Sequence, residues 1–523
     1  MPSRIRKRKA RLWLTCLCAA LAPGLRAQGL DYARDDDSFA LRVAAEGAFG
    51  SGDYTPYYLT ANRQGILSTQ AGTGYMRAAA TWNRDLRHGH LTTVADVQVQ
   101  ADDYSSFYLQ QLAVDLSWRY VYLTAGAWEL DPMLRHRELS SGATVWSGNA
   151  RPIPQVQIGT NGFIDIPGTR RWLQAYFDIS YGRYTDDGYL GSRHETYMQY
   201  WADRGIDKIG TPNSFVTDRL WHHHKQIYFR TDPARAWYVT AGLDHAVQFG
   251  GRTQNNPSTD YTDIAYKVRL KDFFKVLKPT SGDDSDNIGD QNFAYGNHIG
   301  NLNLMLTRQG AWGDVSFYLE NLFEDGSGIA KRNGWDGLWG FEWSRAEEAW
   351  IDGLVVEYLQ TTDQSGPIHW APSDFNQDIQ TKLPNEARGA DDYYNNYFYC
   401  GYAHHGQAIG SPMLKSPAYN ADGYLRFSDS RVRAWHIGLA GHTRPGRRHQ
   451  MGYKLLASYR NAYGTPFLPA NHIQHAFNFL FEYFYEPSDH WDLSVTYAAD
   501  RGSLYGDNTA VGLKATYYLY VAQ

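Results

Sequence analysis

The last fifty residues of the chain alternate between apolar and polar side chains, and this alternation constrains the fold more than any other feature. In the first of three runs, every second residue is apolar or histidine: Ile473, His475, Phe477, Phe479, Phe481, Tyr483 and Tyr485. Gln474, Asn478 and Glu482 lie between them. Side chains of a β-strand point alternately to two faces, so such a run has one apolar and one polar face. Repeated runs of about ten residues are typical of transmembrane β-barrel strands.

The final run also predicts which way the side chains point. We expect the lipid-facing set to be Val511, Leu513, Tyr517 and Leu519, and the lumen-facing set to include Lys514 and Thr516. Similar runs recur from Phe39 onward, and about sixteen are recognisable. Because barrels of this kind usually have an even number of strands, we predict an all-β, antiparallel transmembrane barrel of 18 strands, with 16 as the alternative, and a few short helices.

Composition distinguishes the barrel from a secreted β-sandwich or propeller. The mean hydropathy of −0.53 fits either class, because half of each barrel strand and all the loops are polar. The chain has 39 Tyr and 17 Trp, and such amphipathic rings suit membrane interfaces. There is no repeat of 20–50 residues, which disfavours a propeller.

The N-terminal residues predict a secretory signal peptide over residues 1–27, followed by a single barrel domain over 28–523. A basic stretch precedes the short apolar core Leu12–Ala22, and Leu25-Arg26-Ala27 is an acceptable cleavage site. Cleavage would leave Cys400 as the single cysteine and 43 basic residues against 55 acidic ones, a net charge of −12. An acidic chain argues against nucleic acid as a partner.

Two regions depart from the alternation. Residues 131–168 contain four prolines, which central strands exclude, so we predict a long ordered loop or a lumenal segment there. Residues 262–278 predict one amphipathic helix, with Ile264, Val268, Phe273 or Phe274, and Leu277 on its apolar face. Such a helix would pack in the barrel mouth, lie at the membrane surface, or simply pack on loops.

Motifs for catalysis or metal binding are weak. In His222-His223-His224, and likewise in His404-His405, neighbouring side chains on a strand point to opposite faces, and no carboxylate or cysteine stands at ligand spacing. The chain contains neither Gly-x-Ser-x-Gly nor His-Glu-x-x-His. We therefore expect no metal, no cofactor and no enzymatic activity.

The segment from Lys331 to Gly340 is the best candidate for contact with sugars. It combines the cationic Arg332 with glycines and two tryptophans, Trp335 and Trp339. Aromatic faces stack on the C–H faces of sugars, and arginine pairs with acidic groups. For Trp339 and Trp343, a place in the aromatic belt at the membrane interface is the competing interpretation.

Five segments, in order along the chain, resemble the capsule-assembly Wzi family of outer-membrane proteins in its Bacteroidetes-like form. They are Thr55–Gly65, Ser140–Pro154, Gly242–Gly251, Gly296–Gly300, and Tyr393–Tyr397 with Gly410-Ser411-Pro412. The resemblance implies an 18-stranded barrel with helices near its periplasmic end. It also implies a non-enzymatic role in holding capsular polysaccharide or exopolysaccharide at the cell surface.

The leading hypothesis is therefore a surface-exposed, monomeric outer-membrane barrel of a Gram-negative bacterium that binds polysaccharide in a lectin-like manner. We predict polysaccharide contacts at Arg332, Trp335, Trp339, Tyr393 and Tyr394. Outer-membrane lipid and lipopolysaccharide are the other expected partners. The alternatives are a porin-like channel for small solutes and, less favoured, an outer-membrane hydrolase. An anchor predicts a blocked lumen, whereas a porin predicts an open one.

Overall fold

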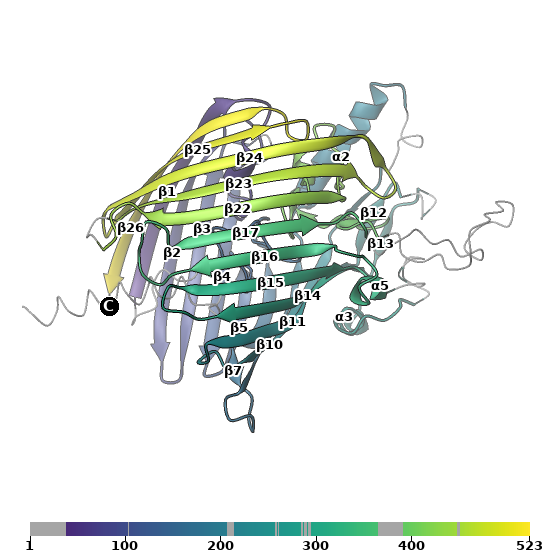
Figure 1. Ribbon diagram of the computed structural model, residues 1–523. Helices are drawn as coiled ribbons and strands as arrows, with labels where there is room; N and C mark the ends of the chain where they lie inside the picture. Colours follow the sequence, from purple (N-terminus) through teal and green to yellow (C-terminus); the bar gives the residue numbers. More distant parts are fainter. Residues whose placement is uncertain are drawn as a thin grey trace, which may run out of the picture.

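The chain forms one closed β-barrel (Figure 1). The computed structural model describes residues 38–102, 104–206, 214–256, 259, 261–283, 286, 290, 294–364, 391–446 and 450–522. The main sheet has 19 strands, one of which, β7, has only two residues. The other strands form the wall, and β1 closes the ring on β26 with Ser38 opposite Ala522 and Ser51 opposite Thr509. The prediction of an 18-stranded antiparallel barrel is confirmed.

The wall consists of long strands and the loops carry the short elements. The wall strands are β1 (Ser38–Ser51), β2 (Gly74–Leu86), β3 (Gly89–Gln100), β4 (Phe107–Trp118), β5 (Val121–Ala127), β6 (Gln155–Thr160), β8 (Leu173–Arg183), β10 (Trp221–Thr231), β11 (Trp237–Phe249), β14 (Asn297–Arg308), β15 (Asp314–Phe323), β16 (Gly337–Ser344), β17 (Gly353–Gln360), β22 (Val432–His442), β23 (Met451–Gly464), β24 (Pro469–Ser488), β25 (Trp491–Arg501) and β26 (Asn508–Ala522). The short elements are η2 (Tyr57–Leu59), β7 (Ile164–Asp165), α2 (Asp187–Ala202), β9 (Val216–Asp218), β12 (Gly251–Gln254), β13 (Ile264–Tyr266), α3 (Leu270–Leu277), α5 (Gly326–Ile329), β18 (Asn395–Asn396), β19 (Cys400–Gly401), β20 (Ala403–His404), β21 (Gln407–Ala408) and η5 (Pro417–Tyr419).

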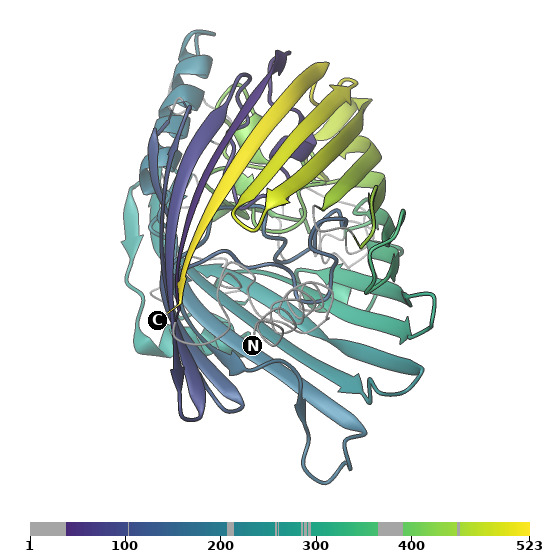
Figure 2. The ribbon, with the colours of Figure 1, turned by 90° about the vertical axis from the view of Figure 1, so that its left-hand side faces the viewer.

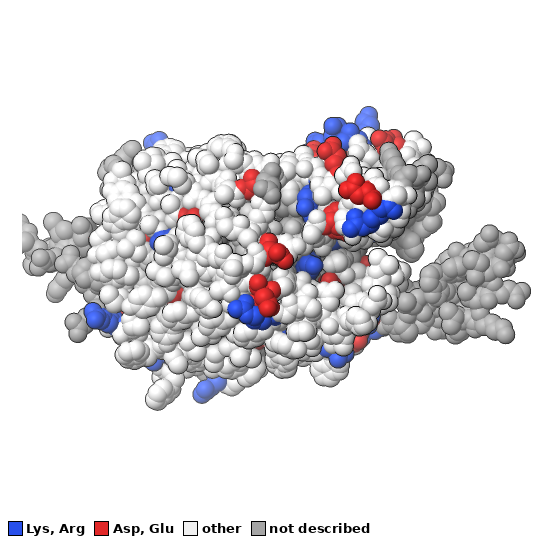
Figure 3. All heavy atoms as spheres, turned by 90° about the horizontal axis from the view of Figure 1, so that it is seen from above, with Lys and Arg blue, Asp and Glu red and all other residues white. Residues whose placement is uncertain are grey.

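The alternation read from the sequence matches the two faces of the wall. Val511, Leu513 and Leu519 are exposed on the outer face, whereas Thr516 is buried in the lumen. The outer face is thus apolar, as a lipid-facing surface must be. In the view from above, most of the wall carries no charge, and charged side chains gather mainly toward the end that bears the loops (Figure 3).

The two ends of the barrel differ in the length of their connections. The end that carries Ser38 and Ala522, here called the terminal end, has tight turns such as those at 87–88 and 119–120. The opposite end, here called the loop end, carries long connections, the longest of them residues 361–431. Barrels of this class have short periplasmic turns and long extracellular loops, so the loop end faces the cell surface.

The helices lie at the loop end, which corrects the expectation of helices near the periplasmic end for the part of the chain that the structure describes. None of these helices is both long enough and apolar enough to cross a bilayer. The predicted helix over 262–278 is shorter than expected, because Ile264–Tyr266 forms strand β13, and only Leu270–Leu277 is α-helical. Pairing with β12 gives the preceding residues a sheet partner that the sequence pattern did not reveal.

Three connections from the loop end fold back into the barrel (Figure 2), and their buried side chains pack in its lumen. They are residues 52–73, 128–154 and 391–431. Buried apolar side chains from all three, among them Leu59, Leu139 and Tyr402, join inward side chains of the strands in one core cluster. The expectation of an ordered lumenal segment over 131–168 holds up to residue 154, after which the chain enters strand β6.

Carboxylates of the wall fasten residues 128–154, here called the lumenal loop. Glu320 of β15 accepts hydrogen bonds from Arg135 Nε at 2.7 Å and from the backbone N–H of Thr144 at 2.7 Å. Glu357 of β17 accepts one from the Ser140 hydroxyl at 2.7 Å. These groups are buried, and a buried charge is stable only when it is paired and hydrogen-bonded. The strands and the lumenal loop therefore depend on each other.

Arg460 joins the other two lumenal segments. Its guanidinium lies 4.0 Å from the ring centroid of Tyr57 and 5.1 Å from that of Tyr505. It also donates to the Met413 carbonyl at 3.0 Å and to Asn478 Oδ1 at 2.9 Å. The side chain is fully buried on β23, so aromatic faces, loop backbone and a side-chain amide together stabilise one cation of the wall.

We predict that Glu320→Ala loosens the lumenal loop without opening the wall. The variant leaves Arg135 buried without its carboxylate, which costs about 3–5 kcal/mol. Amides of residues 134–146 should exchange hydrogen at least tenfold faster, as measured by mass spectrometry on the purified barrel. Glu347→Ala, which removes a carboxylate that is 88% exposed, should leave these amides unchanged. Unchanged exchange in Glu320→Ala as well would contradict the fastening role.

Candidate functional site

The loop between β15 and β16 places the predicted sugar-contacting residues at the loop end. Arg332 is exposed, and the Trp335 side chain is 67% exposed. Trp339 is half-buried, and its ring centroid lies 5.3 Å from that of Trp335. Its indole N–H donates to the Trp335 carbonyl at 3.1 Å. Trp339 therefore supports Trp335 from below, and Arg332 and Trp335 are the groups that a polymer can reach.

Trp339 also fits the competing interpretation. On β16, Trp339 lies opposite Leu319 of β15. Its neighbour Leu338 points inward and is buried, so Trp339 belongs to the outward-facing residues of the strand. Trp339 thus points to the outer face near the loop end, where the aromatic girdle of a barrel is expected. Trp343, four residues further along the same face, donates its indole N–H to the Trp312 carbonyl near the terminal end.

The loop that carries Arg332 and Trp335 is held by buried polar groups. Asn333 Nδ2 donates to the Leu322 carbonyl at 2.6 Å and to the Tyr393 hydroxyl at 3.0 Å. Asp336 accepts the backbone N–H of Gln364 at 2.6 Å. Burial raises the pKa of Asp336 to about 6, because the backbone donors offset only part of the loss of water. The loop is therefore a fixed platform.

Tyr393 and Tyr394 lie beneath the surface, which corrects the expectation that polysaccharide stacks on them. Both are 0% exposed. Tyr393 supports Asn333, as above, and the Tyr394 hydroxyl donates to the Thr144 carbonyl and accepts from the backbone N–H of Ser411. Their rings tie segment 391–431 to the lumenal loop and to the platform. Through Asn333, Tyr393 helps to hold the loop that carries Arg332 and Trp335.

A second group of aromatic side chains, here called the tyrosine patch, gathers above strands β3 to β8. It consists of Tyr104, Tyr108, Tyr189 and His405. Tyr104 and Tyr189 meet edge to face at 5.2 Å, and His405 lies 5.7 Å from Tyr108 and 6.1 Å from Tyr189. Tyr104 is exposed, and the other three are partly so. The patch offers ring faces and edges of the kind that stack on sugars.

Sequence reasoning missed this patch because its members come from three distant segments. Tyr104 lies in the turn between β3 and β4, Tyr108 is at the start of β4, Tyr189 is on α2, and His405 lies in the loop after β20. His405 was singled out only as a weak metal candidate. The density of tyrosine near these positions was the one available signal, and it does not show which rings meet.

Beneath the patch lies a small cavity of about 20 Å³. Its lining includes Tyr184, Asp186, Tyr189, Arg193 and Gly406. Asp186 Oδ2 accepts the backbone N–H of His405 at 2.9 Å, whereas Oδ1 is buried and has no hydrogen-bond partner among the described residues. Burial raises the pKa of Asp186 to about 7. The cavity has room for one water molecule rather than a sugar ring, so the open patch above it is the part that a polymer can contact.

The histidine runs do not assemble a metal centre in the part of the chain that the structure describes. His222 and His224 point inward and stack at 6.3 Å between ring centroids, and His224 Nε2 lies 2.6 Å from Asp244. His223 points to the opposite face, as the alternation predicted, and stacks on Tyr181 at 4.5 Å. These imidazoles pack against aromatic rings and one carboxylate.

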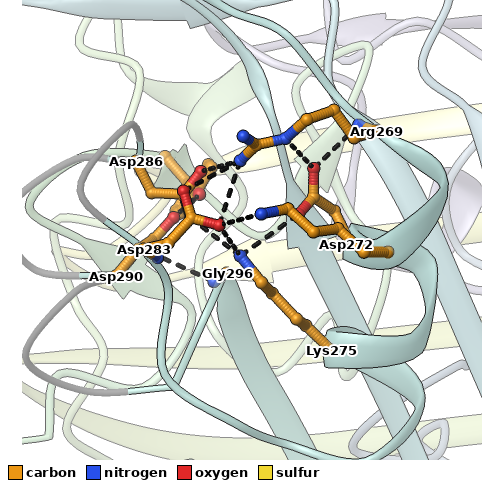
Figure 4. Close-up of polar contacts among 9 residues, drawn as sticks. Arg269, Asp272, Lys275, Asp283, Asp286, Asp290 and Gly296 are labelled. Atoms are coloured by element: carbon orange, nitrogen blue, oxygen red, sulfur yellow. Dashed lines mark hydrogen bonds and ion pairs between the residues drawn. The ribbon is translucent and has the colours of Figure 1, made fainter.

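One acidic group, Asp272, Asp283 and Asp286, has carboxylate oxygens within 4.8 Å of one another. A cation of the chain already occupies its centre (Figure 4). Lys275 Nζ lies 3.1 Å from Asp272, 3.0 Å from Asp283 and 2.9 Å from Asp286. Partial burial would lower the pKa of Lys275, but hydrogen bonds from these carboxylates outweigh it and raise the pKa to about 12. The group is an ion-pair network.

Comparison with known proteins gives one family and one fold. The sequence model of a family described as capsule assembly protein Wzi matches residues 31–418. The structure is similar to that of Wzi of Escherichia coli, described as an outer-membrane protein involved in group 1 capsule assembly and as a carbohydrate-binding β-barrel. The two are 12% identical, the TM-score is 0.53, and the match covers 92% of this chain and 85% of the other.

Two further barrels are less similar. OccAB4 of Acinetobacter baumannii is 9% identical with a TM-score of 0.44, over 93% of this chain and 99% of that one. OccK5 (OpdH) of Pseudomonas aeruginosa is 9% identical with a TM-score of 0.43, over 93% and 98%. Comparison with curated protein sequences finds no match.

We predict that Asp186 makes the loop end sensitive to pH. Its carboxyl binds a proton more tightly in the folded protein, with a pKa of about 7, than in an unfolded chain, where the pKa is about 3.9. Folding therefore favours the protonated form, and stability falls as pH rises from about 4 to about 7. Asp186→Asn should slow proteolysis of the α2 region relative to the unsubstituted protein at pH 8, and the two should be equal at pH 4.5.

The exposed carboxylate of Asp53 provides the control. Asp53→Asn should digest like the unsubstituted protein at both pH values. Equal digestion of Asp186→Asn and the unsubstituted protein at pH 8 would show that Asp186 does not carry this dependence.

Proposed function

Because the chain belongs to the capsule assembly protein Wzi family, we propose that it anchors or assembles capsular polysaccharide or exopolysaccharide at the cell surface by lectin-like, non-catalytic binding. It is an outer-membrane β-barrel. The observation that carries the proposal is the filled lumen, in which three segments from the loop end pack into one core with the wall. A barrel filled in this way supports surface groups at its loop end rather than the passage of solutes.

The inward charges of the wall favour binding over transport. A porin predicts that inward residues such as Asp178, Asp244, Glu320 and Lys514 line a continuous wet path. Lys514 is half-buried, and the other three are hydrogen-bonded. Asp178 accepts from Gln157 at 2.5 Å, and Asp244 pairs with His224, as above. Glu320 holds the lumenal loop. Side chains that are paired in this way do not line a continuous path for ions.

Two aromatic surfaces at the loop end support contact with a polymer. The platform of Arg332 and Trp335 offers an indole face beside a cation, and the tyrosine patch offers phenol rings beside Arg193. They lie over different parts of the rim, above β15–β16 and above β3–β8. A polysaccharide repeats one epitope many times, so several weak contacts on one rigid barrel combine into strong retention.

We predict that the two surfaces contribute separately to polymer binding. Trp335→Ala and Tyr104→Ala should each weaken binding of the purified barrel to the producing cell's surface polysaccharide by about 5- to 30-fold, the result of losing about 1–2 kcal/mol per contact. Binding is measured with immobilised protein. Trp312→Ala and Tyr120→Ala provide matched controls, because both residues are exposed in turns at the terminal end, and both should bind normally.

In cells, loss of the protein should shed polymer into the medium while its export continues. Normal retention of every surface glycan in the deletion strain would reject the proposal. Weakened binding by Trp312→Ala to the same degree as by Trp335→Ala would reject the assignment of the platform.

We predict that the purified barrel gives no stable single-channel conductance in a planar bilayer at 1 M salt, because lumenal side chains and segments occupy the path. A general porin measured in the same bilayer supplies the positive control. Reproducible stepwise conductance of the unsubstituted protein would favour the porin alternative.

A further inference from the structure

Helix α3 lies on the outer face of the barrel wall, at the loop end. Phe273 and Val276 of the helix belong to one cluster with outward residues of β8, β10 and β11. The ring of Phe273 lies 5.4 Å from that of Trp221 and 5.6 Å from that of Phe249. Its carbonyl accepts the Tyr181 hydroxyl at 2.9 Å. One side of the helix is thus docked against the wall.

A second side of the helix is apolar and uncovered. Leu270 is 77% exposed, Phe274 66% and Leu277 36%. At about 100° per residue, these three fall within about 60° of one another around the helix axis. Burying large apolar side chains is favourable, and they are left exposed together mainly where something else covers them.

The uncovered side adjoins the lipid-facing surface of the barrel. On β10 the outward residues Phe229 and Ile227 are exposed, and the next outward residue, Lys225, is buried. Lys225 Nζ donates to the Leu277 carbonyl at 2.5 Å. The last turn of α3 therefore begins where the apolar surface of the strand ends. The exposed side chains of the helix continue that surface toward the cell exterior.

Cations follow the apolar side on the edge away from the wall. Lys271 and Lys278 lie about 80–100° from Leu270 around the helix axis. They lie on one side of Leu270, and Phe273 and Val276 lie on the other. Both are exposed, as is Lys267 just before the helix. Lys271 pairs with Asp283 at 2.6 Å. Around the helix axis, the side docked on the wall is followed by the apolar side and then by the cationic edge. A helix that lies in a membrane interface has this arrangement of apolar and cationic sides.

The remaining side of α3 is fastened to the loop that follows it. Asp272 and Lys275 face Asp283 and Asp286 in the ion-pair network of Figure 4. Arg269 Nη2 pairs with Asp283 at 3.0 Å. With the wall on one side and this network on another, the orientation of the helix is set before any lipid binds.

We propose that α3 is an interfacial anchor that seats the barrel in the outer leaflet. Leu270, Phe274 and Leu277 insert among acyl chains at the upper edge of the bilayer, and Lys271 and Lys278 contact the phosphates of the outer-leaflet lipid. The occupant is a phosphate-bearing lipid surface, chosen because the uncovered side is continuous with the lipid-facing wall and is edged by cations. The proposal is independent of polysaccharide binding.

Spin labels can locate the helix relative to the bilayer. The only described cysteine, Cys400, is buried, so single cysteines introduced at the surface can be labelled. We would label Phe274→Cys, with Leu304→Cys on the lipid-facing wall and Ala421→Cys in an exposed loop as references. In vesicles containing lipopolysaccharide, the Phe274 label should resemble the Leu304 label and be highly accessible to oxygen. Its accessibility to a water-soluble nickel chelate should be at least fivefold lower than that of the Ala421 label.

The cationic edge is tested separately. Lys271→Gln with Lys278→Gln should at least halve the amount of phosphorylated lipopolysaccharide that copurifies with the barrel, whereas Lys415→Gln, at a half-buried lysine distant in sequence, should not. A Phe274 label as accessible to the chelate as the Ala421 label would overturn the proposal. The proposal would also be overturned if, in detergent, the Phe274 label became less accessible to the chelate as the protein concentration rose. That result would indicate that a second copy of the chain covers the helix.

Discussion

Satisfaction of backbone hydrogen bonds within the wall is the constraint on which the rest of this structure depends. A lipid bilayer offers no water to an unpaired N–H or C=O group, so a sheet that crosses it must have no free edge. The pairing of β1 with β26 removes that edge. Once the ring closes, alternate side chains must face either lipid or an enclosed lumen, and the polar ones face the lumen.

The polar lumen then determines how the long loops fold. Buried carboxylates such as Glu320 and Glu357, and the cation of Arg460, need partners because water is excluded around them. The lumenal loop supplies partners for the two carboxylates from Arg135 and Ser140. The other two lumenal segments supply those of Arg460, from Tyr57 and the Met413 carbonyl. The contacts with the two carboxylates hold the lumenal loop in one arrangement. Groups that are held in this way suit a binding surface, since they lose little conformational freedom when a ligand binds.

The sequence predicted the fold well and the candidate site only in part. Strand alternation is a local pattern, so most of the strands and the outward direction of Leu513 were predictable from neighbouring residues, whereas about sixteen of the 18 strands were recognisable in this way. Arg332 and Trp335 were also found, because they stand in one short segment at the surface. Tyr393 was predicted to contact sugar, yet it lies beneath the platform and holds Asn333 from 60 residues away.

What the sequence alone determined was the barrel, its apolar outer face and the existence of an amphipathic helix, because each follows from a period of two or about 3.6 residues along the chain. The tertiary structure decided which loops enter the lumen, which aromatic rings meet in the tyrosine patch, and on which side of the wall α3 lies. These depend on contacts between distant residues, such as the backbone of His405 with Asp186, 219 residues apart. No local pattern records such a pairing, since closure of the wall is what brings the segments together.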